Sequence, residues 1–231
     1  WEDGAQITPP HDTGIMAEVE AVTDYATVKT MSLEAAKEAG LYEVIGEAVD
    51  DAYMEELKKQ VIHQDAIDQM NKDLKIVYSP LHGTGNIPVR RILKELGFEN
   101  VYVVKEQELP DGNFPTVSYP NPEAKEAFEL GLKLAKDVDA DLVLATDPDA
   151  DRLGVRVKDK NGEYHDLTGN MSGCLLANYE ISQRKAVNGS LPEDGALIKT
   201  IVTTNMADAI AKYYNVNLIE CLTGFKYIGQ Q

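Results

Sequence analysis

The chain has 231 residues, of which 43% are hydrophobic, so it can form one large or two modest domains. Its formal net charge of −17 makes nucleic acid and anionic membranes poor partners, because both are negatively charged. Its 2 cysteines are too few for a disulfide framework or a metal cluster, which is typical of a cytoplasmic protein. No apolar run approaches the roughly 20 residues of a membrane-spanning helix, and no signal peptide is evident.

The first 45 residues predict turns and short elements. Residues 15–22 have apolar side chains at helical spacing. Ser32 and Gly40 are a plausible N-cap and C-terminal stop for a second helix. Residues 41–45 are apolar enough for a short strand. Because the chain does not begin with methionine, we expect residues 1–45 to be the end of a preceding domain of a longer protein, followed by a connection.

Residues 46–166 alternate strands with helices, which predicts an α/β domain. Strands are expected at residues 74–79, 101–104, 141–146 and 153–157, and amphipathic helices at 49–61, 89–96 and 121–135. Asn121, Pro122 and Glu123 supply an N-cap, a first-turn proline and an acidic residue for the last helix. No helix separates the last two strands, so they must be antiparallel or belong to different sheets, and the sheet is expected to be mixed.

A second unit is expected over residues 167–231. Asn161-Gly162 predicts a hairpin just before the boundary, and Thr168 is a plausible N-cap for the next helix. Further elements are expected as strands at 196–202 and 216–220 and a helix at 205–214. The predicted fold class is therefore α/β, with two similar units of mixed sheets flanked by helices, the second unit being incomplete.

The most informative stretch is ATDPDADRLG, which lies between the strands at 141–146 and 153–157. Asp147, Asp149 and Asp151 alternate along this loop. Three carboxylates repel one another, and a hard cation such as Mg²⁺ removes that cost while taking substrate phosphate oxygens as further ligands. The next residue, Arg152, offers a planar guanidinium that can bind phosphate or carboxylate. The loop therefore predicts a magnesium site that acts on a phosphorylated substrate.

Other interpretations of this loop are open. Acidic loops are often solvated turns. An EF-hand loop also begins with alternating aspartates, but it has Gly at its sixth position and Glu at its twelfth, where this chain has Arg152 and Lys158. The nucleophile loop of an Asp-x-Asp phosphatase has compatible spacing. The place of the loop at two strand ends, where loops face a cleft, favours a functional site.

Three further residues are candidates with an open alternative. His82 lies in SPLHGTG, a turn between strand and helix that can offer N–H groups to an anion, and it either faces a cleft or caps the turn. Lys199 lies in the apolar run ALIKTIV, and Lys226 lies in TGFKYIG. A lysine among apolar residues is either exposed or partly desolvated with a lowered pKa, the state that suits proton transfer.

Several runs together resemble the α-D-phosphohexomutases, the phosphoglucomutase/phosphomannomutase family: WEDGAQITPPHD, SPLHGTG, PDGNFP with PNPE, TDPDADRLGV and TGFKYIG. The resemblance implies that Asp147, Asp149 and Asp151 hold Mg²⁺ and that Arg152 lies by the reacting phosphate. It also implies that Lys199 or Lys226 handles the proton of a sugar hydroxyl. The substrate-binding residues implied by the resemblance are Asp151, Arg152, Thr223, Gly224 and, if it faces the cleft, His82.

The resemblance implies an isomerase that interconverts hexose 1-phosphate and 6-phosphate through a phosphoserine and a bisphosphate, phosphoglucomutase in the first instance. The expected cofactors are Mg²⁺ and glucose 1,6-bisphosphate, and the expected partners are a small-molecule sugar phosphate and the remaining domains of the parent chain. The domains implied are the end of domain 1 with a connection at 1–45, the metal-binding domain 2 at 46–166, and a truncated domain 3 at 167–231.

Part of the family's machinery is missing from these residues. No serine lies in a loop resembling Thr-Ala-Ser-His-Asn-Pro, and the Gly-Glu-x-Ser-Gly loop that reads the sugar is absent. We therefore expect the chain by itself to be inactive. Two alternatives from other classes are a non-catalytic module that binds Mg²⁺ or a sugar phosphate, and a metal-dependent phosphatase.

Overall fold

The computed structural model describes residues 1–2 and 4–231, which divide into two compact units. The core unit is Val49–Leu191, and the terminal unit combines Trp1–Ala48 with Pro192–Gln231. The helix that we expected to open the second domain, α7 (Gly169–Asn188), falls in the core unit by compactness. The predicted domain boundary near residue 166 stays a prediction.

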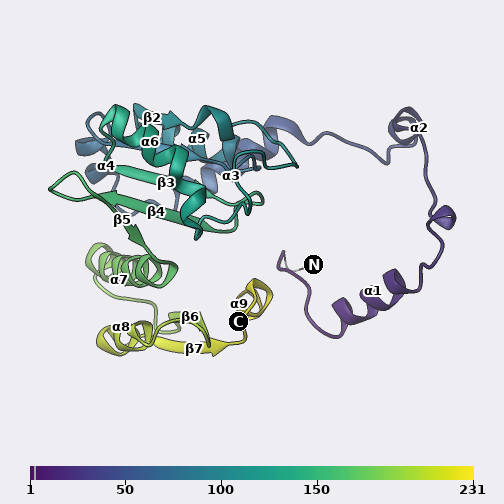
Figure 1. Ribbon diagram of the computed structural model, residues 1–231. Coiled ribbons are helices and arrows are strands. Elements are labelled where there is room, and N and C mark those ends of the chain that lie inside the picture. The colour runs from purple at the N-terminus through teal and green to yellow at the C-terminus, as the bar shows by residue number, and fades with distance from the viewer. Residues whose placement is uncertain (3) are drawn as a thin grey trace. The chain divides into compact units, whose positions relative to one another are not determined.

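The core unit is built on a five-stranded sheet in the order β2-β1-β3-β4-β5 (Figure 1). Its strands are β1 (Lys75–Ser79), β2 (Asn100–Val103), β3 (Leu142–Thr146), β4 (Leu153–Lys158) and β5 (Tyr164–Leu167). Strand β1 is parallel to both β2 and β3, whereas β4 is antiparallel to both β3 and β5. The mixed sheet is confirmed, because only six residues separate β3 from β4 and they turn the chain directly back.

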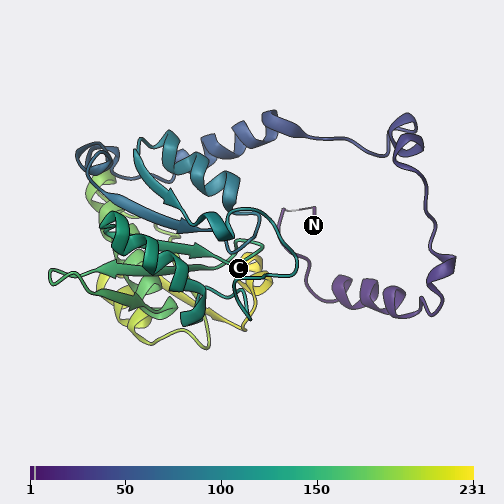
Figure 2. The same cartoon turned by 45° about the horizontal axis from the view of Figure 1, so that its top comes forward.

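Helices pack on this sheet and close its core. They are α3 (Gly46–Lys58), α4 (Gln64–Met70), α5 (Asn86–Glu95), α6 (Glu129–Val138) and α7, with short 3₁₀ turns at η2 (Lys105–Gln107) and η3 (Lys125–Phe128). Helix α6 packs across β1 and β3, where Val77, Val143, Phe128 and Ala135 are fully buried or nearly so. Figure 2 shows α6 lying along the sheet from a second direction. This core fixes the ends of β1 and β3, where the candidate site lies.

Three predicted elements of the first 138 residues differ in the structure. The helix predicted from Asn121 starts later, because the Asn121 side chain accepts a hydrogen bond from the N–H of Glu123 at 2.8 Å and closes a turn instead. The strand predicted at 41–45 is wrong, since those residues are exposed and have no regular structure. The helix predicted over 49–61 ends at Lys58.

The terminal unit contains a small β-α-β arrangement. Strands β6 (Ala196–Thr200) and β7 (Asn217–Cys221) are parallel, and α8 (Met206–Tyr214) connects them and packs on β7. These elements were predicted within two residues. Most of the TGFKYIG run forms α9 (Phe225–Gln230). The N-terminal part adds α1 (His11–Glu20), η1 (Tyr25–Thr27) and α2 (Leu33–Glu38).

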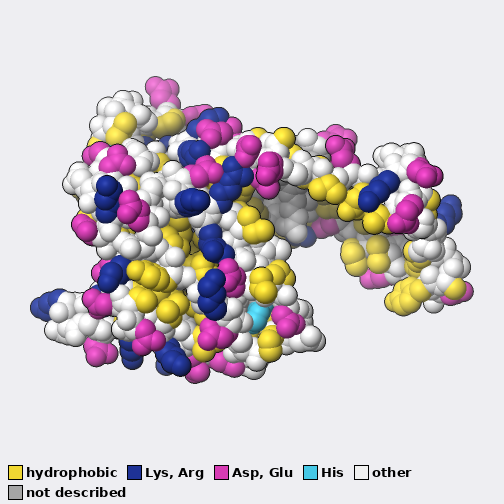
Figure 3. Space-filling view, turned by 90° about the horizontal axis from the view of Figure 1, so that it is seen from above, with side chains coloured by type: hydrophobic (Ala, Val, Ile, Leu, Met, Phe, Trp, Pro, Cys, Tyr) yellow, Lys and Arg dark blue, Asp and Glu magenta, His cyan; other side chains and the backbone are white. Residues whose placement is uncertain are grey.

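The helices of the N-terminal segment bury none of their residues. Ile15, Met16 and Val19 lie on α1 as their spacing predicted, yet they are 46%, 51% and 57% exposed. Figure 3 shows hydrophobic side chains on the surface of this segment. Ser32 caps α2 by accepting the N–H of Ala35 at 3.2 Å, as predicted. Among the residues that the structure describes, no helix is both long and apolar enough to cross a bilayer.

Candidate metal centre

The aspartate loop, residues 147–152, joins β3 to β4 at one end of the core sheet. The N–H of Ala150 donates to the carbonyl of Asp147 at 3.0 Å, and Ala150 has a φ of +61°. The N–H of Arg152 donates to Oδ1 of Asp147 at 3.0 Å. These two bonds close a tight turn, so the alternating aspartates are brought to one side of the loop instead of pointing apart.

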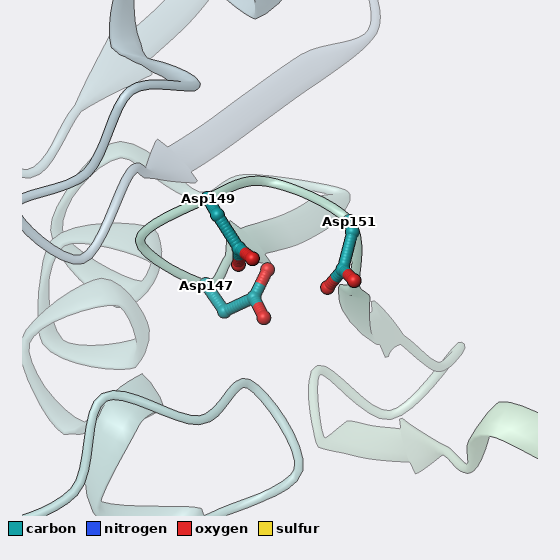
Figure 4. A group of neighbouring side chains, drawn as sticks. All are labelled: Asp147, Asp149 and Asp151. Carbon is teal, nitrogen blue, oxygen red and sulfur yellow. The ribbon is translucent and has the colours of Figure 1, made fainter. Parts of the chain in front are cut away.

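The three aspartates converge. Carboxylate oxygens of Asp147, Asp149 and Asp151 lie within 4.8 Å of one another. Figure 4 shows the carboxylate of Asp147 facing that of Asp149, with Asp151 beside them. Asp147 is only 8% exposed, whereas Asp149 and Asp151 are exposed. The loop therefore presents a group of oxygen donors that is anchored at one end and open to solvent at the other.

The electrostatics of this group are unfavourable without a cation. Burial raises the pKa of Asp147, the negative charges of Asp149 and Asp151 raise it further, and the N–H of Arg152 acts in the opposite direction. The guanidinium of Arg152 is close to two of the carboxylates, with Nε 3.8 Å from Asp147 and 3.9 Å from Asp151. One cation thus faces three carboxylates. The side chain of Arg152 is 56% exposed, so it is available to an anionic ligand.

A hollow of about 260 Å³ lies over the loop. Its other wall is formed by Tyr119, Pro120 and Asn121. This wall lies close to the start of β4, because a Cβ on Gly154 would be only 2.4 Å from the carbonyl oxygen of Pro122. None of the site residues predicted from the sequence lies in this segment. The available signal was the long irregular loop over 110–120, since such loops are usually functional or mobile.

A larger hollow of about 840 Å³ lies along α5, but the two arginines that line it already have carboxylate partners. Arg90 pairs with Glu108 at 2.6 Å. Arg91 pairs with Glu95 at 2.6 Å and also with Asp51. Size alone therefore does not select the functional site. The aspartate loop has the uncompensated charge that a ligand can satisfy.

His82 is part of the framework rather than of an open surface. Its side chain is 6% exposed, Nδ1 is 3.0 Å from the carbonyl oxygen of Leu109, and Nε2 is 2.9 Å from Oγ1 of Thr116. The backbone N–H of His82 donates to the carbonyl of Gln107 at 2.9 Å. These contacts support the structural alternative, in which His82 fastens the loop over 109–116 to the end of β1.

Lys199 is buried in β6, but the lowered pKa that its apolar neighbours suggested is wrong. Its Nζ lies 2.7 Å from Asp208 and 3.2 Å from Glu220. The hydrogen bond to Asp208 raises the pKa of Lys199, and Glu220 adds to the rise against the opposing effect of burial. Because the partners lie on α8 and β7, the local sequence around the lysine could not reveal them.

Lys226, Thr223 and Gly224 lie at the start of α9. The Nζ of Lys226 is 2.8 Å from Oδ2 of Asp12, and this hydrogen bond raises the pKa of the lysine. Its side chain is 29% exposed. Gly224 has a φ of +135°, a conformation that glycine adopts without strain. The functional roles of these three residues stay predictions.

Two protein-family models match most of the chain. Residues 51–162 match phosphoglucomutase/phosphomannomutase alpha/beta/alpha domain II, and residues 168–231 match alpha/beta/alpha domain III of the same family. The chain belongs to the phosphoglucomutase/phosphomannomutase family. The resemblance read from TDPDADRLGV and its companion runs is thereby confirmed.

Curated relatives agree with this family. A phosphoglucomutase of Staphylococcus epidermidis is 35% identical over 231 residues, covering 100% of this chain and 40% of the relative. A probable phosphomannomutase of Haemophilus influenzae is 35% identical over 98% of this chain and 43% of its own length. A phosphoribomutase of Saccharomyces cerevisiae is 34% identical over 100% of this chain and 39% of its own length. The chain thus spans about 40% of the length of these mutases.

Solved structures confirm the fold class. A family protein from Burkholderia thailandensis superimposes with a TM-score of 0.57 over 79% of this chain and 35% of its own, at 22% identity. A putative phosphomannomutase from Thermus thermophilus gives a TM-score of 0.58 over 79% of this chain and 38% of its own, also at 22% identity. The α/β architecture with a mixed sheet is therefore that of phosphohexomutase domains.

The donor set of the aspartate loop fits a hard divalent cation. All three side chains offer oxygen, which Mg²⁺ and Mn²⁺ prefer over nitrogen or sulfur ligands. Two of the three carboxylates are exposed, so water or a phosphate oxygen can complete the shell. Burial, together with the charges of Asp149 and Asp151, raises the pKa of Asp147, so a bound cation would stabilise its ionised form.

Proposed function

We propose that this chain is the metal-binding portion of a phosphohexomutase that interconverts hexose 1-phosphate and 6-phosphate, with glucose as its sugar. The observation that carries the proposal is the convergence of Asp147, Asp149 and Asp151 beside Arg152 in one solvent-open hollow. Oxygen ligands for a divalent cation and an exposed guanidinium for a phosphate are what phosphoryl transfer needs from a protein.

The proposed reaction has two phosphoryl transfers. A phosphoserine, supplied by another part of the parent protein, donates its phosphoryl group to the free hydroxyl of the sugar monophosphate. The proton of that hydroxyl passes to the departing serine oxygen, and a hexose 1,6-bisphosphate results. The bisphosphate then reorients, and its other phosphoryl group returns to the serine oxygen. Glucose 1,6-bisphosphate is accordingly both intermediate and activator.

The chain's own residues bind and orient the moving group. Asp147, Asp149 and Asp151 would hold Mg²⁺, which supplies charge neutralisation for the transferring phosphoryl group when it is bound. Arg152 reaches the same hollow from the end of the loop, so its exposed guanidinium can bind phosphoryl oxygens in a bidentate manner. Tyr119 and Asn121 limit the hollow on the opposite side.

We assign proton transfer to Lys226 rather than to Lys199. Lys199 is 4% exposed and has two carboxylate partners, so a sugar hydroxyl has little access to it. Lys226 is more exposed and has a single carboxylate partner, Asp12. Its raised pKa keeps it protonated near neutral pH, so it can act as the general acid that protonates the sugar oxygen when the other phosphoryl group leaves. Thr223 and Gly224, immediately before it, are the proposed substrate contacts.

The test is an assay of the full-length parent protein with Mg²⁺ and a trace of glucose 1,6-bisphosphate. Glucose, mannose and ribose 1-phosphates are supplied separately, because relatives at 34–35% identity are named for all three sugars. The proposal predicts conversion of glucose 1-phosphate to the 6-phosphate, loss of conversion with EDTA, and no turnover by residues 1–231 alone.

Other outcomes of this assay identify other functions. Faster conversion of mannose or ribose phosphate would overturn glucose as the sugar and keep the mutase. Release of free phosphate without isomerisation would indicate a metal-dependent phosphatase. Metal binding with no reaction on any sugar phosphate would contradict the enzyme and leave a binding module.

A further inference from the structure

The turn that follows β1 lies directly against the aspartate loop. The backbone N–H of Thr84 donates to the carbonyl oxygen of Pro148 at 2.8 Å. The hydroxyl of Thr84 donates to the same oxygen at 3.0 Å. One threonine thus satisfies both lone pairs of a carbonyl that lies 64 residues further along the chain.

The residues on either side of Thr84 bring the two backbones together. A Cβ on Gly83 would lie 2.4 Å from Cα of Pro148, a distance that no side chain tolerates. A Cβ on Gly85 would lie 2.7 Å from Oγ1 of Thr146, the last residue of β3. That hydroxyl is also 2.9 Å from the hydroxyl of Tyr78, which is fully buried. The start of the aspartate loop therefore packs closely against the turn at the end of β1.

The hydrogen bonds from Thr84 to Pro148 affect the metal ligands because of where Pro148 lies in the loop. Pro148 stands between Asp147 and Asp149, and its carbonyl belongs to the peptide group that carries the nitrogen of Asp149. Fixing that carbonyl fixes the plane of the peptide and so the direction in which Asp149 leaves the backbone. Asp147 is held by burial and by the N–H of Arg152, whereas Asp149 is exposed.

We propose that Thr84 is a positioning residue of the metal centre. By holding the Pro148 carbonyl, it keeps Asp149 aimed at Asp147 before a divalent cation binds, which lowers the entropy cost of assembling the ligands. The proposal rests on the metal-binding role given to the aspartates under the proposed function. It does not require that the sugar be glucose or that the reaction be isomerisation.

The experiment measures Mn²⁺ binding by electron paramagnetic resonance on the full-length protein, without substrate. The variants are Thr84→Val, which keeps the shape and the backbone N–H but removes the hydroxyl, and Thr84→Ser, which restores it. The matched control is Thr27→Val, because the hydroxyl of Thr27 also donates to a backbone carbonyl, that of Asp24, at 2.6 Å in an exposed turn of the terminal unit. Melting temperatures are recorded for all variants.

Thr84→Val is expected to weaken Mn²⁺ binding about three- to tenfold, the range given by the net contribution of one hydrogen bond. Thr84→Ser and Thr27→Val are expected to stay within about twofold of the wild type. Wild-type affinity in Thr84→Val would overturn the proposal, and so would weak binding in Thr84→Ser, since the hydroxyl is then not the determinant. A wild-type protein that binds no Mn²⁺ at the loop would overturn it as well.

The mutase assay separates this proposal from the proposed function. If the wild type isomerises no sugar phosphate but Thr84→Val still loosens Mn²⁺, the positioning role stands and the function is wrong. If the wild type isomerises glucose phosphate and Thr84→Val binds Mn²⁺ normally, the function stands and the positioning role is wrong.

Discussion

Two clusters of three charged residues show opposite arrangements in this protein. The aspartate loop brings together Asp147, Asp149 and Asp151, and the exposed Arg152 lies close to two of them. The lysine cluster of the terminal unit, Lys199 with Asp208 and Glu220, places one cation between two carboxylates at 2.7 and 3.2 Å. The first has like charges facing each other, and the second has a cation enclosed by its counter-ions.

Burial does not distinguish the two clusters, but the sign of the neighbours does. Asp147 is 8% exposed and Lys199 is 4% exposed. Burial is the main cause of the raised pKa of Asp147, and the charges of Asp149 and Asp151 add to it, whereas the hydrogen bond from Lys199 to Asp208 is the main cause of the raised pKa of Lys199. A raised pKa means that the ionised form is destabilised when the group is an acid and stabilised when the group is a base. The fold itself thus satisfies the lysine cluster and leaves the aspartate loop to a ligand.

The largest effect is expected from removing one exposed carboxylate of the loop. Asp149→Asn should lower kcat/KM of the full-length mutase by about 100-fold or more, because a ligand that stabilises transition-state charge is lost. The matched control is Asp137→Asn, an exposed aspartate on α6, which should leave the rate unchanged. Equal rates for both variants would make the aspartate loop a solvated turn.

The second largest effect is expected from a steric change at Gly83, which packs against the start of the aspartate loop. Gly83→Ala is expected to destabilise the protein by about 1–3 kcal/mol, because its methyl group would overlap the backbone of Pro148. Gly112→Ala is the control, since a Cβ there meets nothing within 4 Å. Urea unfolding of both variants measures the difference. A Gly83→Ala protein as stable as the control would contradict the close packing.

A substitution in the lysine cluster is expected to lower the stability of the protein and to leave its catalytic rate unchanged. Lys199→Met leaves Asp208 and Glu220 without their cation, so the melting temperature should fall by several degrees at neutral pH. The exposed Lys212→Met on α8 should leave it unchanged. Lys199 has a pKa raised above 10.5, so its contribution is fully present below that pH and is lost as the pH rises through the folded value. A stable Lys199→Met protein with abolished turnover would instead make Lys199 the catalytic lysine.

The smallest effect is expected from removing the buried charge of the aspartate loop, and its sign is opposite to that expected for Lys199→Met. Asp147→Asn should raise the melting temperature of the metal-free protein by roughly 2–4 °C, the shift given by about 1 kcal/mol in a domain of this size. The raised pKa of Asp147 means that its ionised form costs stability as the pH rises through that pKa, and Asn removes the charge. Added Mg²⁺ should stabilise the wild type but not Asp147→Asn. A variant that is less stable than the wild type without metal would contradict the unbalanced charge.

The aspartate loop could be predicted from the sequence because its chemistry is local. The three carboxylates are two residues apart, and the apolar runs on both sides specify the strands that hold them. The mixed sheet followed from the same local argument, since no helix separates β3 from β4. The two strands and the helix of the terminal unit were likewise predicted from their hydrophobic patterns, but the parallel pairing of the strands was not.

What the sequence did not predict has tertiary causes in two cases and a local cause in one. The pairing of Lys199 depends on α8 and β7, which no reading of its own strand reveals. The turn at Asn121 competes with a helix start, because its side chain can accept an N–H in either structure. The contact of Thr84 with Pro148 joins loops at the ends of two different strands. The contacts of Lys199 and Thr84 are set by how strands are placed side by side, which the sequence pattern does not specify.

The most direct test of the central claim is an anomalous diffraction experiment on crystals of the full-length protein grown with Mn²⁺. Mn²⁺ accepts the same oxygen donors as Mg²⁺ and scatters anomalously. The account predicts a peak coordinated by carboxylate oxygens of Asp147, Asp149 and Asp151. Mn²⁺ found at other residues, with the three aspartates turned away from one another into solvent, would contradict it.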